Sequence, residues 1–141
     1  MKEKFVEYKQ ALALKELGFD EPCLAYWSLD MVGDTIAVFR YNNRIAQAES
    51  RDNGQWFNHN NDAPHIWSAP LKQQVFQFFR DKYKLHGNVN IRTYFIYDIS
   101  SYNDFKTIKV YDKLENTYEE SEIACINKLI EIAKNNNNEK V

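Results

Sequence analysis

The spacing of apolar residues along the chain predicts three amphipathic helices. The first covers residues 3–17, and Gly18 follows it at the position where a left-handed residue commonly ends a helix. The second begins with Ser68 as N-cap and Pro70 in its first turn, and Gly87 ends it. At about 100° per residue, one arc of this second helix holds Leu71, Val75, Phe76, Phe78, Phe79 and Tyr83. We assign this arc to the core, because exposed Phe rings would forfeit burial energy.

The third helix has the clearest signals and covers residues 117–134. Thr117 followed by Glu120 makes a capping box at its start. Its apolar stripe consists of Cys125, Ile126, Leu129, Ile130, Ile132 and Ala133. The polar run NNNNEKV that follows predicts a disordered tail over residues 135–141.

Strand-like runs rich in β-branched and aromatic residues occupy the stretches between the helices. Residues 23–29, 35–41 and 44–50 predict an antiparallel meander, although a helical turn stays open for the last of them. Residues 90–100 alternate strongly and predict a central strand, which residues 105–112 follow as another.

Together these elements predict an α+β fold in the order α-β-β-β-α-β-β-α. We expect a single domain over residues 1–134, with an antiparallel sheet of about four to five strands packed by the three amphipathic helices. A chain of 141 residues can bury about two-thirds of its unfolded surface, so it needs no metal or disulfide for stability.

Composition and charge narrow the range of functions. The formal net charge is −2 with a pI near 5.9, and the sequence has no basic stripe of the kind that duplex DNA binders carry. Cys23 and Cys125 stand far apart, which predicts two reduced, buried thiols in a reducing cytoplasm. The N-terminus lacks an apolar signal region, and no run approaches the ~18 apolar residues of a membrane span. We therefore expect a cytoplasmic protein.

The segment 51–66 breaks every hydrophobic period, yet it contains Trp56 and Phe57. Connections of this length in a compact domain are often functional or contain an unrecognised strand, and QWFNH is a candidate for such a strand. Exposed Trp and neighbouring aromatic residues concentrate binding energy at interfaces. The candidate binding surface predicted here consists of Arg51, Trp56, Phe57, His59, His65 and Trp67.

Catalytic and metal-binding patterns are weak. His59, Asp62 and His65 form the only cluster of ligand-type residues, but zinc sites use tighter or repeated spacings, so we expect a polar loop and no metal. Ser68 lacks a GxSxG context, and Cys125 lies on an apolar stripe. No glycine-rich loop is present to hold a phosphate. The sequence favours a non-enzymatic role without a cofactor, and leaves enzymatic activity open.

Three blocks resemble a known family. They are ALALKELGFDEPCLAYW at 11–27, SAPLKQQVFQFFRDKY at 68–83 and TYEESEIACINKLIEIAK at 117–134. They are similar to small uncharacterised proteins encoded by phages and prophage-like regions of Bacteroides-type gut anaerobes. Members share an LKELGFDEPC start, an AP-x-x-x-Q-x-F-x-x-FR helix and a TYEEAE-x-AC terminal helix. The resemblance implies a scaffold and transfers no catalytic residue.

These observations support three functional hypotheses. The first is a phage-type accessory protein that binds a protein of the host or phage. The second is a small-ligand or nucleotide-binding module. The third is a single-stranded nucleic-acid binder, in which aromatic strands stack bases beside Arg40, Arg44, Arg51 and Arg92. The sequence does not determine the oligomeric state.

Overall fold

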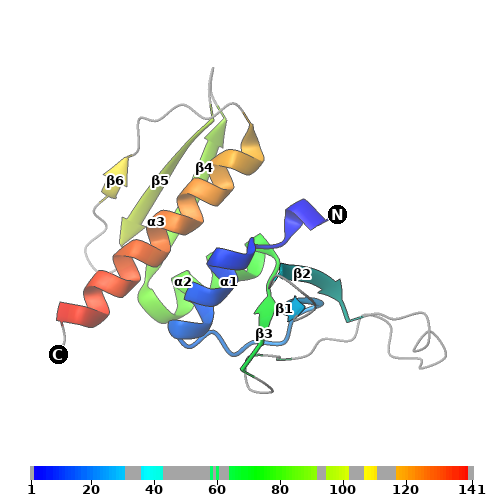
Figure 1. The fold of residues 1–141 in the computed structure, drawn as a ribbon. Coiled ribbons are helices and arrows are strands. Elements are labelled where there is room, and N and C mark those ends of the chain that lie inside the picture. The colour runs from blue at the N-terminus through cyan, green and yellow to red at the C-terminus, as the bar shows by residue number, and fades with distance from the viewer. Residues whose placement is uncertain are drawn as a thin grey trace. The chain divides into compact units, whose positions relative to one another are not determined.

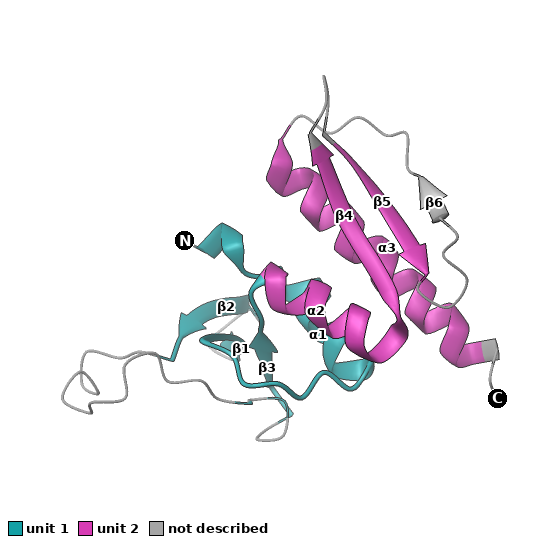
Figure 2. Ribbon diagram, turned by 180° about the vertical axis from the view of Figure 1, so that it is seen from behind, with its two compact units in different colours: residues 1–71 teal, residues 72–141 magenta. Residues whose placement is uncertain are grey.

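The computed structural model describes residues 2–30, 36–42, 58, 60, 64–91, 95–101, 107–110 and 117–139. The chain divides into two compact units, residues 1–71 and 72–141 (Figure 2). Each unit contains one three-stranded antiparallel sheet, which confirms the α+β class. The predicted antiparallel strands are present, but they form two sheets of three strands each and not one sheet of four to five. The single domain over residues 1–134 stays a prediction.

The described part of unit 1 contains a short helical turn, one helix and three strands (Figure 1). Its sheet has the order β2-β1-β3, and Trp27 in the central strand pairs with Phe39 on one side and Trp67 on the other. The elements are η1 (Lys2–Lys4), α1 (Tyr8–Glu16), β1 (Ala25–Asp30), β2 (Ile36–Tyr41) and β3 (Ile66–Ala69).

Helix α1 ends as its sequence predicts. Gly18 adopts a left-handed conformation with φ of 83°. Its N–H donates to the Lys15 carbonyl at 3.0 Å, and the Phe19 N–H donates to the Leu14 carbonyl at 2.9 Å. These two bonds form a Schellman motif, which satisfies carbonyls that the end of a helix would otherwise leave unpaired. Phe19, which follows Gly18, is fully buried, and a hydrophobic contact at this position frequently accompanies the motif.

The third strand of unit 1 is not the predicted one. Ser68 lies in β3 and is not a helix N-cap; its N–H donates to the Asn60 side-chain oxygen at 2.8 Å. The helix begins only at Lys72, because the residue before a proline is biased towards extended backbone and Pro70 directly follows β3. The predicted strand at 44–50 lies outside the described residues.

Unit 2 contains two helices and a sheet of order β4-β5-β6 (Figure 1). The single strand predicted at 90–100 is wrong, since the chain reverses there and Ile91 pairs with Phe95. The alternation of apolar and polar residues continues from one strand into the next, so the sequence pattern does not show where the first strand ends and the second begins. The last strand falls within the predicted 105–112. The elements are α2 (Lys72–Tyr83), β4 (Leu85–Ile91), β5 (Phe95–Ser101), β6 (Thr107–Val110) and α3 (Tyr118–Glu139).

The apolar faces of α2 and α3 form the core of unit 2, as predicted. Phe76 is 7% exposed, and Phe79 and Leu129 are fully buried. The predicted capping box is present at the start of α3. The Glu120 N–H donates to Thr117 Oγ1 at 3.1 Å, and the Thr117 N–H donates to Glu120 Oε2 at 3.2 Å.

Both helices of unit 2 end at other residues than predicted. Helix α2 stops at Tyr83, where Lys84 takes a positive φ of 56°, and does not reach Gly87. Helix α3 continues to Glu139, past the start of the tail predicted at 135–141, and its last described side chains are exposed. Asn residues are weak helix formers, but they tolerate exposure on a helix that is already nucleated.

Gly87 lies within β4, where the strand approaches α3 closely. A Cβ atom at this position would lie 2.9 Å from Cys125 Sγ, 2.9 Å from Leu129 Cδ1 and 3.1 Å from Phe76 Cε1. Since real Cβ atoms essentially never come within 3.0 Å of another heavy atom, the absence of a side chain allows this packing.

We expect Gly87→Ala to lower the free energy of unfolding by about 1–3 kcal/mol, the usual cost of overpacking a core. Urea unfolding monitored by circular dichroism measures the change. Cys125→Ala removes one of the clashing atoms. Gly87→Ala should therefore lower the free energy of unfolding less in a Cys125→Ala background than in the wild-type protein. Equal stability of Gly87→Ala and wild type would contradict the packing described for β4.

Candidate functional site

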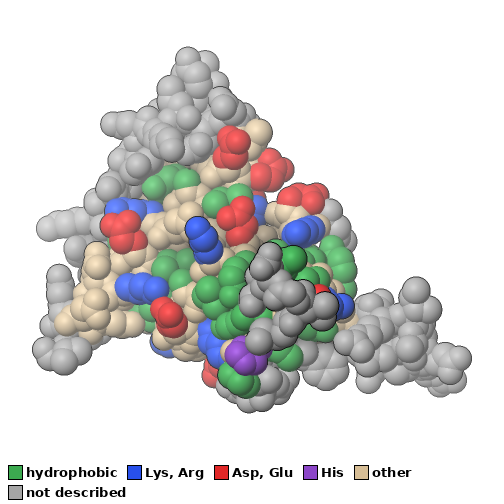
Figure 3. All heavy atoms as spheres, in the orientation of Figure 1, with side chains coloured by type: hydrophobic (Ala, Val, Ile, Leu, Met, Phe, Trp, Pro, Cys, Tyr) green, Lys and Arg blue, Asp and Glu red, His purple; other side chains and the backbone are tan. Residues whose placement is uncertain are grey.

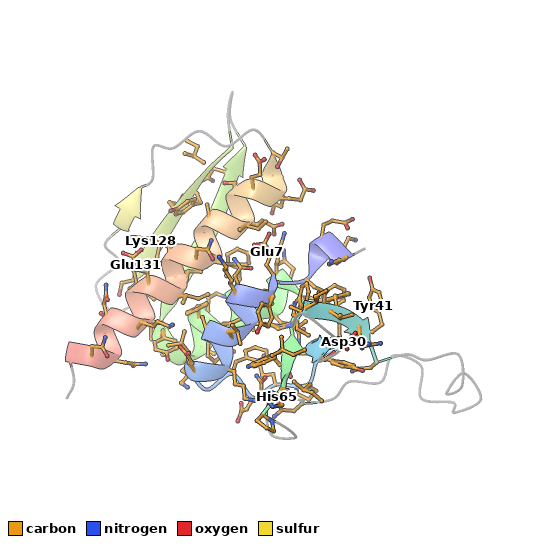
Figure 4. The ribbon with its side chains drawn as sticks, viewed as in Figure 1. Glu7, Asp30, Tyr41, His65, Lys128 and Glu131 are labelled. Carbon is orange, nitrogen blue, oxygen red and sulfur yellow. The ribbon has the colours of Figure 1, made fainter. Side chains whose placement is uncertain are left out.

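The structure describes two of the six predicted binding residues. His65 is exposed at the turn before β3, and its carbonyl accepts a hydrogen bond from the Leu29 N–H at 3.3 Å (Figure 4). Trp67 is half-buried within β3. The other four predicted residues, Arg51, Trp56, Phe57 and His59, lie outside the described residues.

Trp67 packs against the helix of its own unit. Its ring centroid lies 5.4 Å from that of Tyr8, in an edge-on arrangement. The Lys15 ammonium lies 5.8 Å from the Trp67 ring and donates to the Ile66 carbonyl at 3.3 Å. Trp67 therefore already has a structural role between β3 and α1, which makes it a weaker anchor for a partner than the sequence suggests.

Two asparagines of the segment 51–66 form hydrogen bonds with backbone groups elsewhere in unit 1. The Asn58 side-chain amide donates to the Asp20 carbonyl at 2.6 Å, and that of Asn60 donates to the Phe19 carbonyl at 2.8 Å. The Asn60 side-chain oxygen also accepts the Ser68 N–H. These residues thus supply hydrogen bonds to backbone groups beyond the C-terminus of α1 and in β3. This role was not predicted, because the sequence NHNN at residues 58–61 has the composition of a solvent-exposed loop.

The exposed apolar residues point to a different surface, on β2. Among the described residues the most exposed large hydrophobic side chains are Ile36 at 58%, Tyr41 at 42% and Tyr118 at 37%. The first two are the ends of β2, whose middle residues are half-buried apart from the exposed Arg40. Within the described part of the chain, β2 pairs with β1 only. We call Ile36–Tyr41 the β2 edge.

The β2 edge carries apolar groups on both faces of the sheet. The register places Ile36 opposite Asp30 and Tyr41 opposite Ala25, and successive residues of a strand alternate between faces. Arg40 shares the face of Ile36, where its guanidinium lies 3.3 Å from the Asp30 carboxylate (Figure 4 labels Asp30 and Tyr41). A strand with no described partner along one side and with exposed apolar side chains at both ends can accept another strand.

Aromatic rings form a cluster on the face of the sheet that carries Tyr41. Ring centroids lie 5.3 Å apart for Phe5 and Phe39, 5.0 Å for Phe39 and Tyr41, and 5.3 Å for Trp27 and Phe39. Trp27 and Phe5 are buried, whereas Phe39 is half-buried and Tyr41 is exposed. Figure 3 shows hydrophobic side chains gathered over this unit. We call Phe5, Trp27, Phe39 and Tyr41 the aromatic cluster.

Unit 2 contains a buried pair of charged side chains. The Lys72 ammonium lies 3.9 Å from a Glu122 carboxylate oxygen, and the two residues are 3% and 7% exposed. Burial raises the pKa of the Glu122 carboxyl, while Lys72 opposes this rise and Glu119 adds to it. The hydroxyl of Ser121, one residue earlier on α3, is buried and has no hydrogen-bond partner among the described residues. The pair joins the starts of α2 and α3 and has a structural role.

Neither cysteine has the features of a nucleophile. Cys23 and Cys125 are fully buried and unpaired, as predicted. Burial raises the pKa of each thiol to about 12. Among the described residues no three His, Cys, Asp or Glu side chains come together as metal ligands. His59 and Asp62 of the weak histidine cluster lie outside the described residues, so that cluster stays untested.

Comparisons with protein-family models, curated proteins and solved structures find no match to this chain. The resemblance to phage-encoded proteins therefore stays a prediction, and the functional assignment rests on geometry. No helix in the described ranges combines the length and the apolar character that crossing a bilayer demands.

The reactivity of the two cysteines tests the conclusion that their thiols are buried and protonated. At pH 8 a thiol with a pKa of about 12 is ionised in on the order of one molecule in ten thousand. We expect iodoacetamide to leave both cysteines unmodified in the native protein and to modify both in urea, as measured by intact mass. Rapid native modification of either thiol would contradict its burial.

The buried pair predicts a particular pH dependence of stability. Because the native pKa of Glu122 lies above its ordinary value of 4.5, the native state binds this proton more tightly than the unfolded state. The contribution of Glu122 to the free energy of unfolding therefore falls as the pH rises from about 4.5 through the native pKa.

We expect the Glu122→Gln variant to lack this decrease in the free energy of unfolding with rising pH. A change in stability that is the same at every pH does not affect this comparison. Urea unfolding at several pH values measures the slope. Glu131→Gln is the matched control, since the Glu131 side chain is 56% exposed and pairs with Lys128 at the surface (Figure 4). If both variants keep the wild-type slope, the role assigned to Glu122 is wrong.

Proposed function

We propose that the chain is a non-enzymatic accessory protein of phage type, and that its β2 edge binds an extended segment of a host or phage protein. The observation that carries this proposal is the concentration of exposed apolar side chains on one edge strand. Ile36 and Tyr41 are the two most exposed large hydrophobic residues described, and both belong to β2.

Strand addition explains this exposure physically. An edge strand presents backbone N–H and C=O groups that a partner strand can satisfy, while side chains on alternate positions provide specificity. Fully burying an Ile side chain contributes about 1.5–3 kcal/mol, and Ile36 is 58% exposed before binding. Apolar groups on both faces favour a partner that runs alongside the strand over one that covers a single face.

The geometry favours a protein partner over single-stranded nucleic acid. Base stacking requires exposed rings with cations beside them to bind the phosphates. Arg40, the only one of the four candidate arginines whose side chain the structure describes, is on the opposite face from Phe39 and Tyr41. It also interacts with the Asp30 carboxylate. Arg40 is therefore not placed beside these rings, where the nucleic-acid hypothesis needs an arginine to bind a phosphate.

We expect Ile36→Lys to reduce capture of the partner by about tenfold or more, which corresponds to about 1.4 kcal/mol of lost binding energy. The measurement is affinity capture from host extract with tagged protein, quantified by mass spectrometry. Tyr118→Lys is the matched control, because it places the same charge at an exposed apolar position of unit 2. Thermal unfolding establishes that both variants fold.

Three outcomes would contradict the proposal. They are equal capture by wild type and Ile36→Lys, equal loss with Tyr118→Lys, and a wild-type protein that captures only further copies of itself. Sedimentation velocity at several concentrations detects the third outcome, in which β2 pairs with the same strand of another copy.

A further inference from the structure

A lysine of the chain itself occupies a corner between two aromatic rings of unit 1. The Lys2 ammonium lies 5.1 Å from the centroid of the Trp27 ring and 5.8 Å from that of Phe39. These two rings are 5.3 Å apart and meet at 67°, so their faces form two walls. The electron-rich faces of aromatic rings attract a cation within about 6 Å. We call this arrangement the Trp27–Phe39 corner.

The walls of the corner are fixed by the rest of unit 1. The Trp27 indole N–H donates to the Val6 carbonyl at 3.1 Å, and the Tyr8 ring lies 5.9 Å from the Trp27 ring. Phe39 packs against Phe5, which is buried. Preorganised walls of this kind bind a ligand without the entropic cost of ordering the rings.

The occupant is held much less firmly than the walls. Lys2 belongs to η1, a three-residue turn with no buried residue. The turn is joined to the next residue by the hydrogen bond from the Phe5 N–H to the Lys2 carbonyl at 3.0 Å. Exposed cation–π contacts are weak, so a competing cation can replace Lys2 without unfolding unit 1.

Local helix geometry does not account for the position of Lys2. Lys82 also lies over two rings, 5.5 Å from Phe78 and 5.7 Å from Tyr83, but all three belong to α2. Residues four apart on a helix are neighbours in any case. Lys2 is far in sequence from both of its rings, and its position depends on the tertiary fold of unit 1.

We infer that the Trp27–Phe39 corner is an ammonium-binding subsite, and that a lysine side chain of the bound partner segment displaces Lys2 from it. The inference rests on the proposed function, because Phe39 belongs to both the corner and the β2 edge. It assigns to the partner an extended segment with a lysine that reaches the corner. Lys2 then acts as an internal competitor, which lowers the apparent affinity by the fraction of molecules with the corner occupied.

N-acetyl-lysine methylamide is a direct probe of the corner. We expect it to shift the Trp27 indole N–H resonance in a two-dimensional NMR titration, with Trp27→Phe used to assign the signal. N-acetyl-norleucine methylamide, which has the same carbon chain but lacks the charged amino group, should leave the resonance in place. Equal shifts with the two compounds would overturn the inference, because the subsite would then not recognise an ammonium group.

Lys2→Ala should lower the dissociation constant of the probe by about two- to fivefold, as expected from the loss of a weak internal competitor. Lys4→Ala removes the same charge from an exposed residue of the same turn and should leave it unchanged, as should Lys82→Ala. Phe39→Leu, which removes one wall, should weaken binding in every background. Identical dissociation constants of the probe for wild type, Lys2→Ala and Lys4→Ala would contradict the inference that a bound lysine displaces Lys2.

This titration and the capture experiment fail independently of each other. If capture depends on Ile36 but the lysine probe shifts no resonance, the β2 edge stands and the ammonium subsite is wrong. If the probe binds as expected but capture is insensitive to Ile36→Lys, the subsite stands as a cation site and the proposed strand addition is wrong.

Discussion

Burial of aromatic and aliphatic side chains between a helix and a sheet is the constraint on which each unit depends. In unit 1 the rings of Phe5, Tyr8 and Trp27 lie between the N-terminal elements and the strands. In unit 2 the corresponding layer contains Phe76 and Leu129, and β4 approaches α3 so closely that position 87 has room for glycine alone. Because most large apolar side chains of the described helices are buried, apolar surface that stays exposed requires an explanation.

Among the described residues, that exposed surface lies mainly on β2. A sheet of three strands leaves two edges, and the β2 edge carries the large apolar side chains that natural edge strands usually avoid. Natural proteins discourage unwanted pairing at an edge with charged residues, and Arg40 with Asp30 and Lys2 near Phe39 are the charges found here. In the inference drawn above, Lys2 shields the Trp27–Phe39 corner in part of the free molecules, and a lysine of the partner replaces it on binding.

Among the described residues, the buried titratable side chains pack within the interior and do not form a cluster of metal ligands. Both thiols are buried and hold their protons, and the Lys72–Glu122 pair is enclosed where α2 and α3 begin. A buried pair of this kind is weak evidence for stability, because the attraction between the charges must offset the cost of removing both from water.

The sequence by itself determined the presence of three helices, the buried faces of α2 and α3, and the local signals at the end of α1 and the start of α3. Gly18 and the Thr117–Glu120 box depend on neighbours within one turn, so they can be read from the chain alone. Only the tertiary structure decided that Ser68 lies in a strand, that Gly87 is a packing position and that β2 forms an edge. These outcomes depend on which distant segments pair, and hydrophobic periodicity carries no information about the identity of a partner strand.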